Sequence, residues 1–481
     1  MRNVRSFEHN DKRGQRAVVH VEVVETSELG DRSYIAHDGV TAVVIDPQRD
    51  LDRLEAILAA RGLTCAVVLE THVHNDYVTG GYELARRTGA RYVLSAADEV
   101  AFDRHAVQDG DELTAGRLRI RTVATPGHTD THLAYLIDAP QDAPDESPVA
   151  FTGGSLLYSS VGRTDLVDPA RTEELTRTQF RSARRLAGLL DDDARVFPTH
   201  GFGSFCSSGS SSGENSSTIG QERARNDALT VDDEDTFVGR LVAGLTAYPR
   251  YYAHMGALNR QGPGPADLSP PQPVEPDELR KRIAAGQWIV DLRDRTAYAA
   301  EHLAGSVGIA LGEQFSTYLG WLIPWGTALT LIGDSAEQVA GAQRQLVRIG
   351  IDRPAGAAVG TPGELAAGDE LRSYRRATFA DLAATSGTAT SGAATFGVGP
   401  VVLDVRRDDE RACGHVPGSV HVPLHSLLER LDEVPDTQLW VHCASGYRAS
   451  IAASLLDRGG REVVLIDDEY ATAVKIGLAT G

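Results

Sequence analysis

The sequence predicts an α/β protein in which a large layered domain is followed by two smaller α/β domains. Up to about residue 260, short apolar runs of strand length alternate with helix-length amphipathic segments, a mixture typical of sheets covered by helices. Beyond a segment rich in proline and glycine at 261–276, one pattern of residues occurs twice. With 481 residues, the chain is also too long for a single hydrophobic core.

The first block, residues 1–260, is expected to fold as one α/β sandwich. Its apolar runs are rich in valine, isoleucine and leucine, and its helical segments place apolar residues three or four positions apart. The expected strands are 18–24, 41–45, 66–69, 118–123 and 133–137. The expected helices are 51–60, 80–88 and 171–190.

The second half of the chain contains an internal repeat. Asp-Leu-Arg at 291–293, followed by a histidine at 302, recurs as Asp-Val-Arg at 404–406, followed by a histidine at 415. Both features are shifted by 113 positions. A constant shift over two separate features indicates two copies of one folding unit. We therefore predict α/β domains at 272–375 and 376–481.

Histidines follow several of the expected strands in patterns that suit a metal site. His72 and His74 lie two positions apart after the strand at 66–69, so their imidazoles point to the same side. His128 follows a Thr-Pro-Gly turn that brings a third imidazole from another strand. We predict as metal ligands His72, His74 and His128, with Asp76 and His200 as further candidates.

A second reactive site is predicted at Cys443. The loop 443–448 joins a strand to a helix, so the thiol faces unpaired backbone N–H groups at a helix N-terminus. These groups stabilise the thiolate, which is the nucleophilic form. Arg448 adds a positive charge that suits an anionic sulfur donor. We predict as catalytic residues Cys443 and Arg448, and as substrate-binding residues Ala444, Ser445, Gly446 and Tyr447.

These motifs resemble two known families. Residues 1–260 are similar to the persulfide dioxygenase (ETHE1-like) branch of the metallo-β-lactamase superfamily, which implies an αββα sandwich. The segments that carry this similarity are 44–47, 71–76, 125–129, 161–166 and 217–223. The Cys-x4-Arg loop, together with the upstream Asp404 and His415-x-x-Gly418, resembles the active site of rhodaneses. Fusion to two rhodanese domains is a recurring bacterial arrangement, and the resemblance covers essentially the whole chain.

The resemblance implies Fe(II) held by His72, His128 and a carboxylate at position 154, and an activity that oxidises a thiol persulfide to sulfite. In this chain residue 154 is glycine, and Tyr77 replaces the last histidine of the loop. Three outcomes are open: a three-histidine metal site, a site completed by Asp76 or another carboxylate, and a scaffold without metal. Zinc is the alternative metal. A dinuclear zinc thioester hydrolase is disfavoured, because Gly154 and Tyr77 cannot supply its ligands.

We therefore expect an enzyme of sulfur metabolism. A dioxygenase-like metal domain would be coupled to a rhodanese sulfurtransferase that acts through a persulfide on Cys443, with a low-molecular-weight thiol persulfide or thiosulfate as substrate. The alternatives are a sulfurtransferase with a catalytically degraded front domain, a thioester hydrolase, and a persulfide carrier without turnover. The first repeat has neither cysteine nor arginine in its matching loop, 331–338, and is expected to be structural.

The overall charge and the cysteine content exclude some classes of partner. A formal net charge of −20 disfavours nucleic acid and anionic membrane surfaces. The 4 cysteines are too few for a disulfide framework and favour a reducing compartment. The sequence shows neither a signal-peptide pattern nor an apolar run of about 20 residues. We expect a cytoplasmic protein, and a homo-oligomer is left open.

Overall fold

The computed structural model describes residues 4–6, 19–139, 146–208, 213–385 and 400–480. The chain divides into two compact units. Unit 1 comprises Met1–Asp267 with Val347–Gly350, and unit 2 comprises Leu268–Leu346 with Ile351–Gly481. Within the described residues, the structure contains no helix that is both long and apolar enough to cross a membrane.

Unit 1 is built on two sheets over its described residues. The first sheet has seven strands in chain order: β1 (Val4–Ser6), β2 (His20–Thr26), β3 (Asp31–His37), β4 (Thr41–Ile45), β5 (Thr64–Leu69), β6 (Arg91–Ser95) and β7 (His105–Val107). The second sheet has six strands in the order β13 (Ser217–Thr218), β12 (Arg195–Pro198), β11 (Val149–Gly153), β10 (Leu133–Asp138), β9 (Leu118–Ala124) and β8 (Glu112–Ala115).

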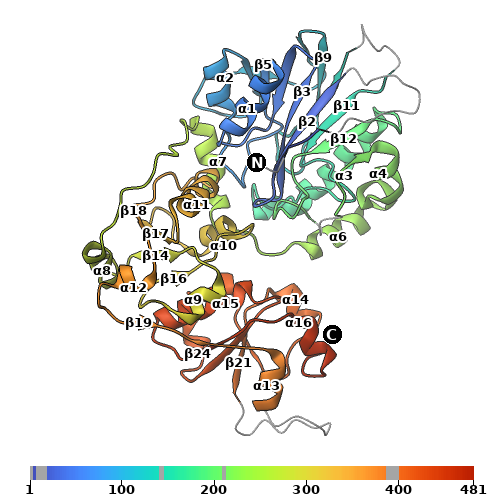
Figure 1. Ribbon diagram of the computed structural model, residues 1–481. Helices are drawn as coiled ribbons and strands as arrows, with labels where there is room; N and C mark the ends of the chain where they lie inside the picture. The colour runs from blue at the N-terminus through green and yellow to red at the C-terminus, as the bar shows by residue number, and fades with distance from the viewer. Residues whose placement is uncertain (1–3, 7–18, 140–145, 209–212, 386–399, 481) are drawn as a thin grey trace. The chain divides into compact units, whose positions relative to one another are not determined.

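Helices cover the outer faces of both sheets, so unit 1 has four layers (Figure 1). The helices of the first half are α1 (Asp52–Arg61) and α2 (Gly81–Thr88). Those of the second half are η1 (Pro169–Arg171), α3 (Thr172–Gly188), α4 (Ile219–Arg225), α5 (Asp227–Thr230), α6 (Glu234–Gly244) and α7 (Tyr252–Gln261). The predicted αββα sandwich is confirmed.

The alternation of side chains along each strand produces these layers. In β4, Val43 and Ile45 lie in the core between the two sheets, whereas Val44 packs toward α1 and α2. In β10, Tyr135 lies between the sheets and Leu136 packs toward α3. Every strand of this kind is buried on both faces, which explains why the sequence shows continuous apolar runs there.

The carboxyl ends of several strands meet at one edge of the second sheet. β9 and β11 are both antiparallel to β10, and β12 is parallel to β11, so these three strands run in the same direction. The loop after β5 is tied to this sheet, because Leu133 N donates to Thr71 O at 2.7 Å. The predicted histidines follow β5, β9 and β12.

Unit 2 contains two parallel sheets among its described residues. One has the order β16 (Val307–Gly308), β14 (Trp288–Asp291), β17 (Leu329–Gly333) and β18 (Gly356–Val359). The other has the order β20 (Arg375–Ala377), β24 (Val463–Ile466), β23 (Leu439–His442), β21 (Val401–Asp404) and β22 (Val420–His421). A separate short pair joins β15 (His302–Leu303) to β19 (Leu371–Arg372).

Short helices surround these sheets. Around the first parallel sheet they are α8 (Pro276–Ala284), α9 (Arg295–Ala300), α10 (Phe315–Leu322), α11 (Ala336–Arg348) and α12 (Pro362–Ala366). Around the second they are α13 (Phe379–Thr385), α14 (Asp408–Ala412), η2 (Leu424–Ser426), η3 (Leu431–Glu433), α15 (Tyr447–Arg458) and α16 (Tyr470–Lys475).

The internal repeat is visible in the hydrogen bonds. Arg293 pairs with Asp291 at 2.6 Å and donates to the carbonyl of Glu301 at 2.9 Å. Arg406 pairs with Asp404 at 2.7 Å and donates to the carbonyl of Gly414 at 2.8 Å. The same buried arginine therefore ties the end of a strand to the same downstream loop in both copies.

Candidate metal centre and thiol loop

The loop after β5 carries the first two histidines and is held by Asp46. The Asp46 carboxylate accepts hydrogen bonds from the Thr71 amide and the Thr71 hydroxyl, both at 2.7 Å. It also accepts one from the hydroxyl of Thr199, which directly precedes His200. One buried carboxylate therefore fixes two loops from different sheets, and it sets the direction in which His72 and His200 emerge.

Three imidazoles of this region are oriented by hydrogen bonds at Nδ1. His72 Nδ1 lies 2.9 Å from the Thr71 hydroxyl, which gives its own proton to Asp46 and therefore accepts here. His128 Nδ1 donates to the carbonyl oxygen of Arg163 at 2.7 Å. His200 Nδ1 lies between two carboxylates, 2.9 Å from Asp31 and 3.2 Å from Asp76. With Nδ1 protonated, each Nε2 presents a lone pair.

The Nε2 side of these imidazoles faces a common point. Ligand atoms of His72, His128 and His200 all lie within 4.8 Å of one another, and the Nε2 atoms of His72 and His200 are 3.3 Å apart. All three side chains are buried. Lone pairs that converge without a donor between them repel unless a cation or a proton lies there. The residues present therefore fit a metal ion.

The electrostatics of the cluster agree with this interpretation. Burial and the neighbouring imidazoles lower the pKa of His72 well below its usual range, and burial lowers the pKa of His128 to about 3. Burial also opposes a charge on His200, but Asp76 and Asp31 raise its pKa to about 10. Asp76 and Asp31 therefore stabilise a positive charge on His200.

His74 lies beside this cluster, with its Nδ1 4.0 Å from Asp76 and its Nε2 among a separate set of buried polar groups. Its Nε2 is 3.2 Å from Glu70, 3.3 Å from Asp46 and 3.0 Å from the hydroxyl of Tyr77. Although burial acts against the charge, Asp46 and Glu70 raise the pKa of His74 to about 9. The structure thus groups His72 and His128 with His200, and it places the third predicted ligand, His74, in a buried ion pair.

Asp76, the other carboxylate considered from the sequence, lies next to His200. It is buried, and neither of its carboxylate oxygens has a well-oriented hydrogen bond within the described part of the chain. With His74 and His200 it forms a second group whose ligand atoms lie within 4.8 Å of one another. Its contact to His200 holds the pKa of Asp76 below its usual range, although burial opposes this shift.

The space beside Gly154 is filled by the imidazole of His128. A Cβ atom built on Gly154 would lie 2.6 Å from Cγ of His128, and one built on Gly162 would lie 2.6 Å from its Nδ1. The ring therefore sits against two glycines. The Gly154 amide donates to Nε2 of His132 at 2.9 Å, which gives His132 a packing role beside the cluster.

Several orienting groups have no motif in the sequence. They are Asp31, the carbonyl of Arg163, the side chain of Gln179 and Gly162. Gln179 accepts from the His128 amide at 2.8 Å and donates to the carbonyls of Gly154 and Ser155. The only sequence signal for any of them is the segment 161–166, which carries part of the resemblance to the dioxygenase branch.

Cys443 lies where β23 ends and α15 begins. Gly446, with φ of +90°, turns its amide toward Cys443, and its N–H donates to Sγ at 3.2 Å. A side chain at 446 would also overlap the carboxylate of Asp467, so both the backbone angle and the space favour glycine. The thiol is only 1% exposed. The loop therefore offers a backbone hydrogen-bond donor to sulfur, a contact that stabilises a thiolate.

The other residues of the loop have clear roles in the structure. Both terminal nitrogens of Arg448 bind Glu410 of α14, one of them at 2.6 Å, so this arginine is already paired. The hydroxyl of Tyr447 donates to the carbonyl of Ala310 at 3.0 Å. The carbonyl of Ala444 accepts from the Tyr470 amide at 2.7 Å, and Ser445 is exposed.

The matching loop of the first copy contains no thiol but is closed by a side chain. Oε1 of Gln338 accepts from the Asp334 amide at 2.8 Å, and Nε2 of Gln338 donates to the carbonyl of Leu292 at 3.0 Å. The glutamine thus satisfies polar groups that a ligand would otherwise reach.

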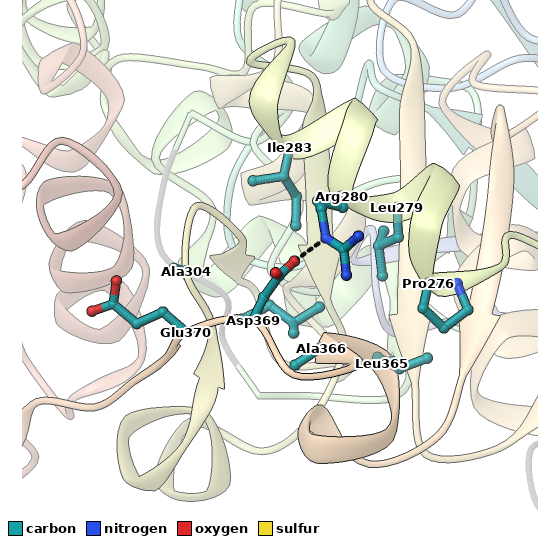
Figure 2. Close-up of a pocket in the computed structure, with 10 residues that line it drawn as sticks. Pro276, Leu279, Arg280, Ile283, Ala304, Leu365, Ala366, Asp369 and Glu370 are labelled. Atoms are coloured by element: carbon teal, nitrogen blue, oxygen red, sulfur yellow. Dashed lines mark hydrogen bonds and ion pairs between the residues drawn. The ribbon is translucent and has the colours of Figure 1, made fainter.

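A separate hollow of about 260 Å³ lies on the first copy (Figure 2). Figure 2 shows Arg280 reaching across it to Asp369, with Leu279 and Ile283 of α8 on one side and Leu365 of α12 on the other. Its lining residues include no cysteine or histidine. This hollow therefore does not contain the groups that carry the chemistry predicted from the sequence.

Comparisons with known proteins agree with both parts of the chain. The first part is 29% identical over 209 residues to the persulfide dioxygenase ETHE1 of Homo sapiens, covering 43% of this chain and 72% of that one. It is also 34% identical over 166 residues to a hydroxyacylglutathione hydrolase of Brucella anthropi, covering 33% of this chain and 57% of the relative.

Among solved structures, a metallo-beta-lactamase from Staphylococcus aureus subsp. aureus COL matches with a TM-score of 0.64 and 26% identity, over 72% of this chain and 100% of that one. The model of the rhodanese-like domain family matches residues 391–472, which include Cys443. The chain thus joins a metallo-β-lactamase-fold domain, similar in sequence to persulfide dioxygenases, to a C-terminal rhodanese-like domain.

Proposed function

We propose that this protein is an enzyme that transfers sulfane sulfur through Cys443 and oxidises a low-molecular-weight thiol persulfide in its metallo-β-lactamase-fold domain. The observation that carries the proposal is the difference between the two sites. A backbone N–H donates to the Cys443 sulfur, whereas ring nitrogens of His72, His128 and His200 lie within 4.8 Å of one another. The likeness of the first part to persulfide dioxygenases supports the same chemistry.

In the transfer step, the Cys443 thiolate attacks the sulfane sulfur of the donor. A bond forms between Sγ and that sulfur, and the bond between the sulfane sulfur and its carrier breaks. The electron pair leaves with the carrier, as sulfite from thiosulfate or as a thiolate from a thiol persulfide. The Gly446 amide, 3.2 Å from Sγ, stabilises the negative charge on sulfur before the attack.

In the first domain, His72, His128 and His200 would hold the metal, with Fe(II) as the ion suited to this activity and zinc as the alternative. When bound, Fe(II) supplies the oxygen chemistry that converts a persulfide, dioxygen and water into thiol and sulfite. The protein's own part is to hold each imidazole through Thr71, the Arg163 carbonyl and Asp31, and to keep bulk water from the buried ligands.

The metal half of the proposal is tested on protein purified without oxygen. We expect near-stoichiometric iron by elemental analysis, and oxygen uptake matched by sulfite release when a thiol persulfide is added. If the purified protein holds no metal but still transfers sulfur from thiosulfate to cyanide, the proposed persulfide oxidation by the first domain is contradicted.

That result would support a second candidate function, a sulfurtransferase with a front domain that no longer oxidises substrate. The packing of the His128 ring against Gly154 is the observation that favours it, because the position of the family's carboxylate is occupied. A thioester hydrolase, as the name of the Brucella anthropi relative suggests, is a weaker alternative. It predicts thiol release from an acylated thiol without oxygen uptake.

A further inference from the structure

The two arginines next to the Cys443 loop differ in how their guanidinium groups are used. Arg448, inside the loop, binds Glu410 through both terminal nitrogens, and its side chain is 12% exposed. Arg295, from α9 of the first copy, binds Asp467 through Nε alone at 2.7 Å, and its side chain is 32% exposed. Its two terminal nitrogens make no hydrogen bond or ion pair to any described residue.

Arg295 lies directly against the part of the loop that holds the sulfur. Its Nε is 3.4 Å from a Cβ atom built on Gly446, the residue whose amide donates to Cys443 Sγ. Burial disfavours its charge, but Asp467, Asp294 and the Cys443 thiolate raise the pKa of Arg295. Asp294 itself is engaged at the start of α9, where it accepts from the amide and the hydroxyl of Thr296.

The first copy also forms a wall of the Cys443 site. The ring of Tyr318, on α10, lies 5.9 Å from the ring of Tyr447, whose hydroxyl binds the carbonyl of Ala310. Helix α15 packs against β16, and Ser454 donates to the carbonyl of Gly308 at 3.4 Å. These contacts place the first copy against Tyr447 of the Cys443 loop and against helix α15, which follows it.

We propose that Arg295 of the first copy, which has no thiol of its own, determines donor specificity by binding the anionic group of the sulfur donor at Cys443. That group is the sulfonate of thiosulfate or the carboxylate of a thiol persulfide, and both present two coplanar oxygens to a guanidinium fork. Arg448 cannot take this role without leaving Glu410. The inference rests on the proposed function, in which Cys443 accepts sulfane sulfur.

The test measures how fast Cys443 gains one sulfur atom, followed by intact mass, as the donor concentration is varied. In Arg295→Ala, the thiosulfate concentration for half-maximal rate should rise by about 10–100-fold, the loss expected for a charge-assisted pair, while the maximal rate changes little. Arg295→Lys should recover part of the loss. Arg295→Gln retains an N–H group that can donate to Asp467, so it replaces the alanine variant in this test if that variant unfolds.

Two controls separate donor binding from a structural effect. Arg376→Ala removes the other arginine that pairs with Asp467, at 3.1 Å, and should leave the half-maximal concentration unchanged. The persulfide of mercaptoethanol carries no anionic group beside its sulfur, so Arg295→Ala should not affect its use. Glutathione persulfide should follow thiosulfate if carboxylates are bound, and mercaptoethanol persulfide if only sulfonates are.

The inference is overturned if Arg295→Ala leaves thiosulfate use unchanged, or if it weakens the charged and uncharged donors equally. Failure of the underlying function has a different signature. In that case Cys443→Ser would not change the release of sulfite from thiosulfate, whichever residue stands at 295.

Discussion

The metal cluster and the thiol loop present opposite kinds of polar atoms to a ligand. In the cluster, His72, His128 and His200 donate hydrogen bonds through Nδ1, so their Nε2 atoms carry lone pairs. In the thiol loop, the backbone presents an N–H to sulfur. A site lined by acceptors selects a cation, and a site lined by donors selects an anion. The atoms that line each site thus favour a metal cation in one part of the chain and an anionic sulfur in the other.

The sharpest way to break this comparison is at the nucleophile. Cys443→Ser should reduce sulfur transfer from thiosulfate to cyanide by at least about 10³-fold, because the hydroxyl is a far weaker nucleophile. Metal content should not change. Cys413→Ser, at an exposed cysteine, is the matched control and should retain full transfer. If Cys443→Ser still transferred sulfur, Cys443 could not be the nucleophile.

The complementary break is at a metal ligand. His72→Ala should remove iron more completely than the ~10–100-fold loss of affinity typical of an orienting residue, because a direct ligand is deleted. Sulfur transfer by Cys443 should be unaffected, as it should also be after treatment of the natural protein with a chelator. His105→Ala, at an exposed histidine, is the control. Unchanged iron in His72→Ala would exclude the cluster as the binding site.

A smaller effect is expected at Gly154, against which the His128 ring packs. Gly154→Ala places a Cβ atom against the His128 ring and should weaken metal binding by roughly 10–100-fold, because the ligand must move. Gly239→Ala is the matched control, since nothing lies within 4 Å of its Cβ position. Equal metal affinity in both variants would show that His128 is not a ligand.

The mildest change concerns the group behind His200. Asp31→Asn keeps an oxygen near Nδ1 of His200 but removes a charge, so metal affinity should fall by about 10-fold, at the low end for an orienting residue. Asp138→Asn breaks an ion pair with Arg119 at the surface and should have no effect. A titration with the metal, followed by calorimetry, measures both variants.

Local patterns predicted much of the fold. The apolar runs at 41–45 and 133–137 correspond to β4 and β10, and the expected helix at 51–60 corresponds to α1. These elements are specified by neighbouring residues, through strand alternation and helical periodicity. The internal repeat was likewise visible in the sequence, and Arg293 and Arg406 show why: each fixes an equivalent loop through the same contacts.

The partners of the histidines could not be predicted in this way. Asp31 and His200 are 169 positions apart, and the contact between them depends on how the two sheets pack. The orientation of His74 had a local signal, because Glu70 and Asp46 are carboxylates at the ends of buried strands and attract a nearby imidazole. Arg295 likewise approaches Gly446 of the Cys443 loop only through packing between the two copies.

The position of His128 between two glycines has a consequence for how the chain can change. An aspartate introduced at 154 would meet the imidazole of His128, so this substitution alone would not add a carboxylate to the cluster. A carboxylate at 154 requires His128 to shift together with the new side chain. Residues 128, 154 and 162 are therefore expected to change as one unit, and their substitutions should be strongly non-additive.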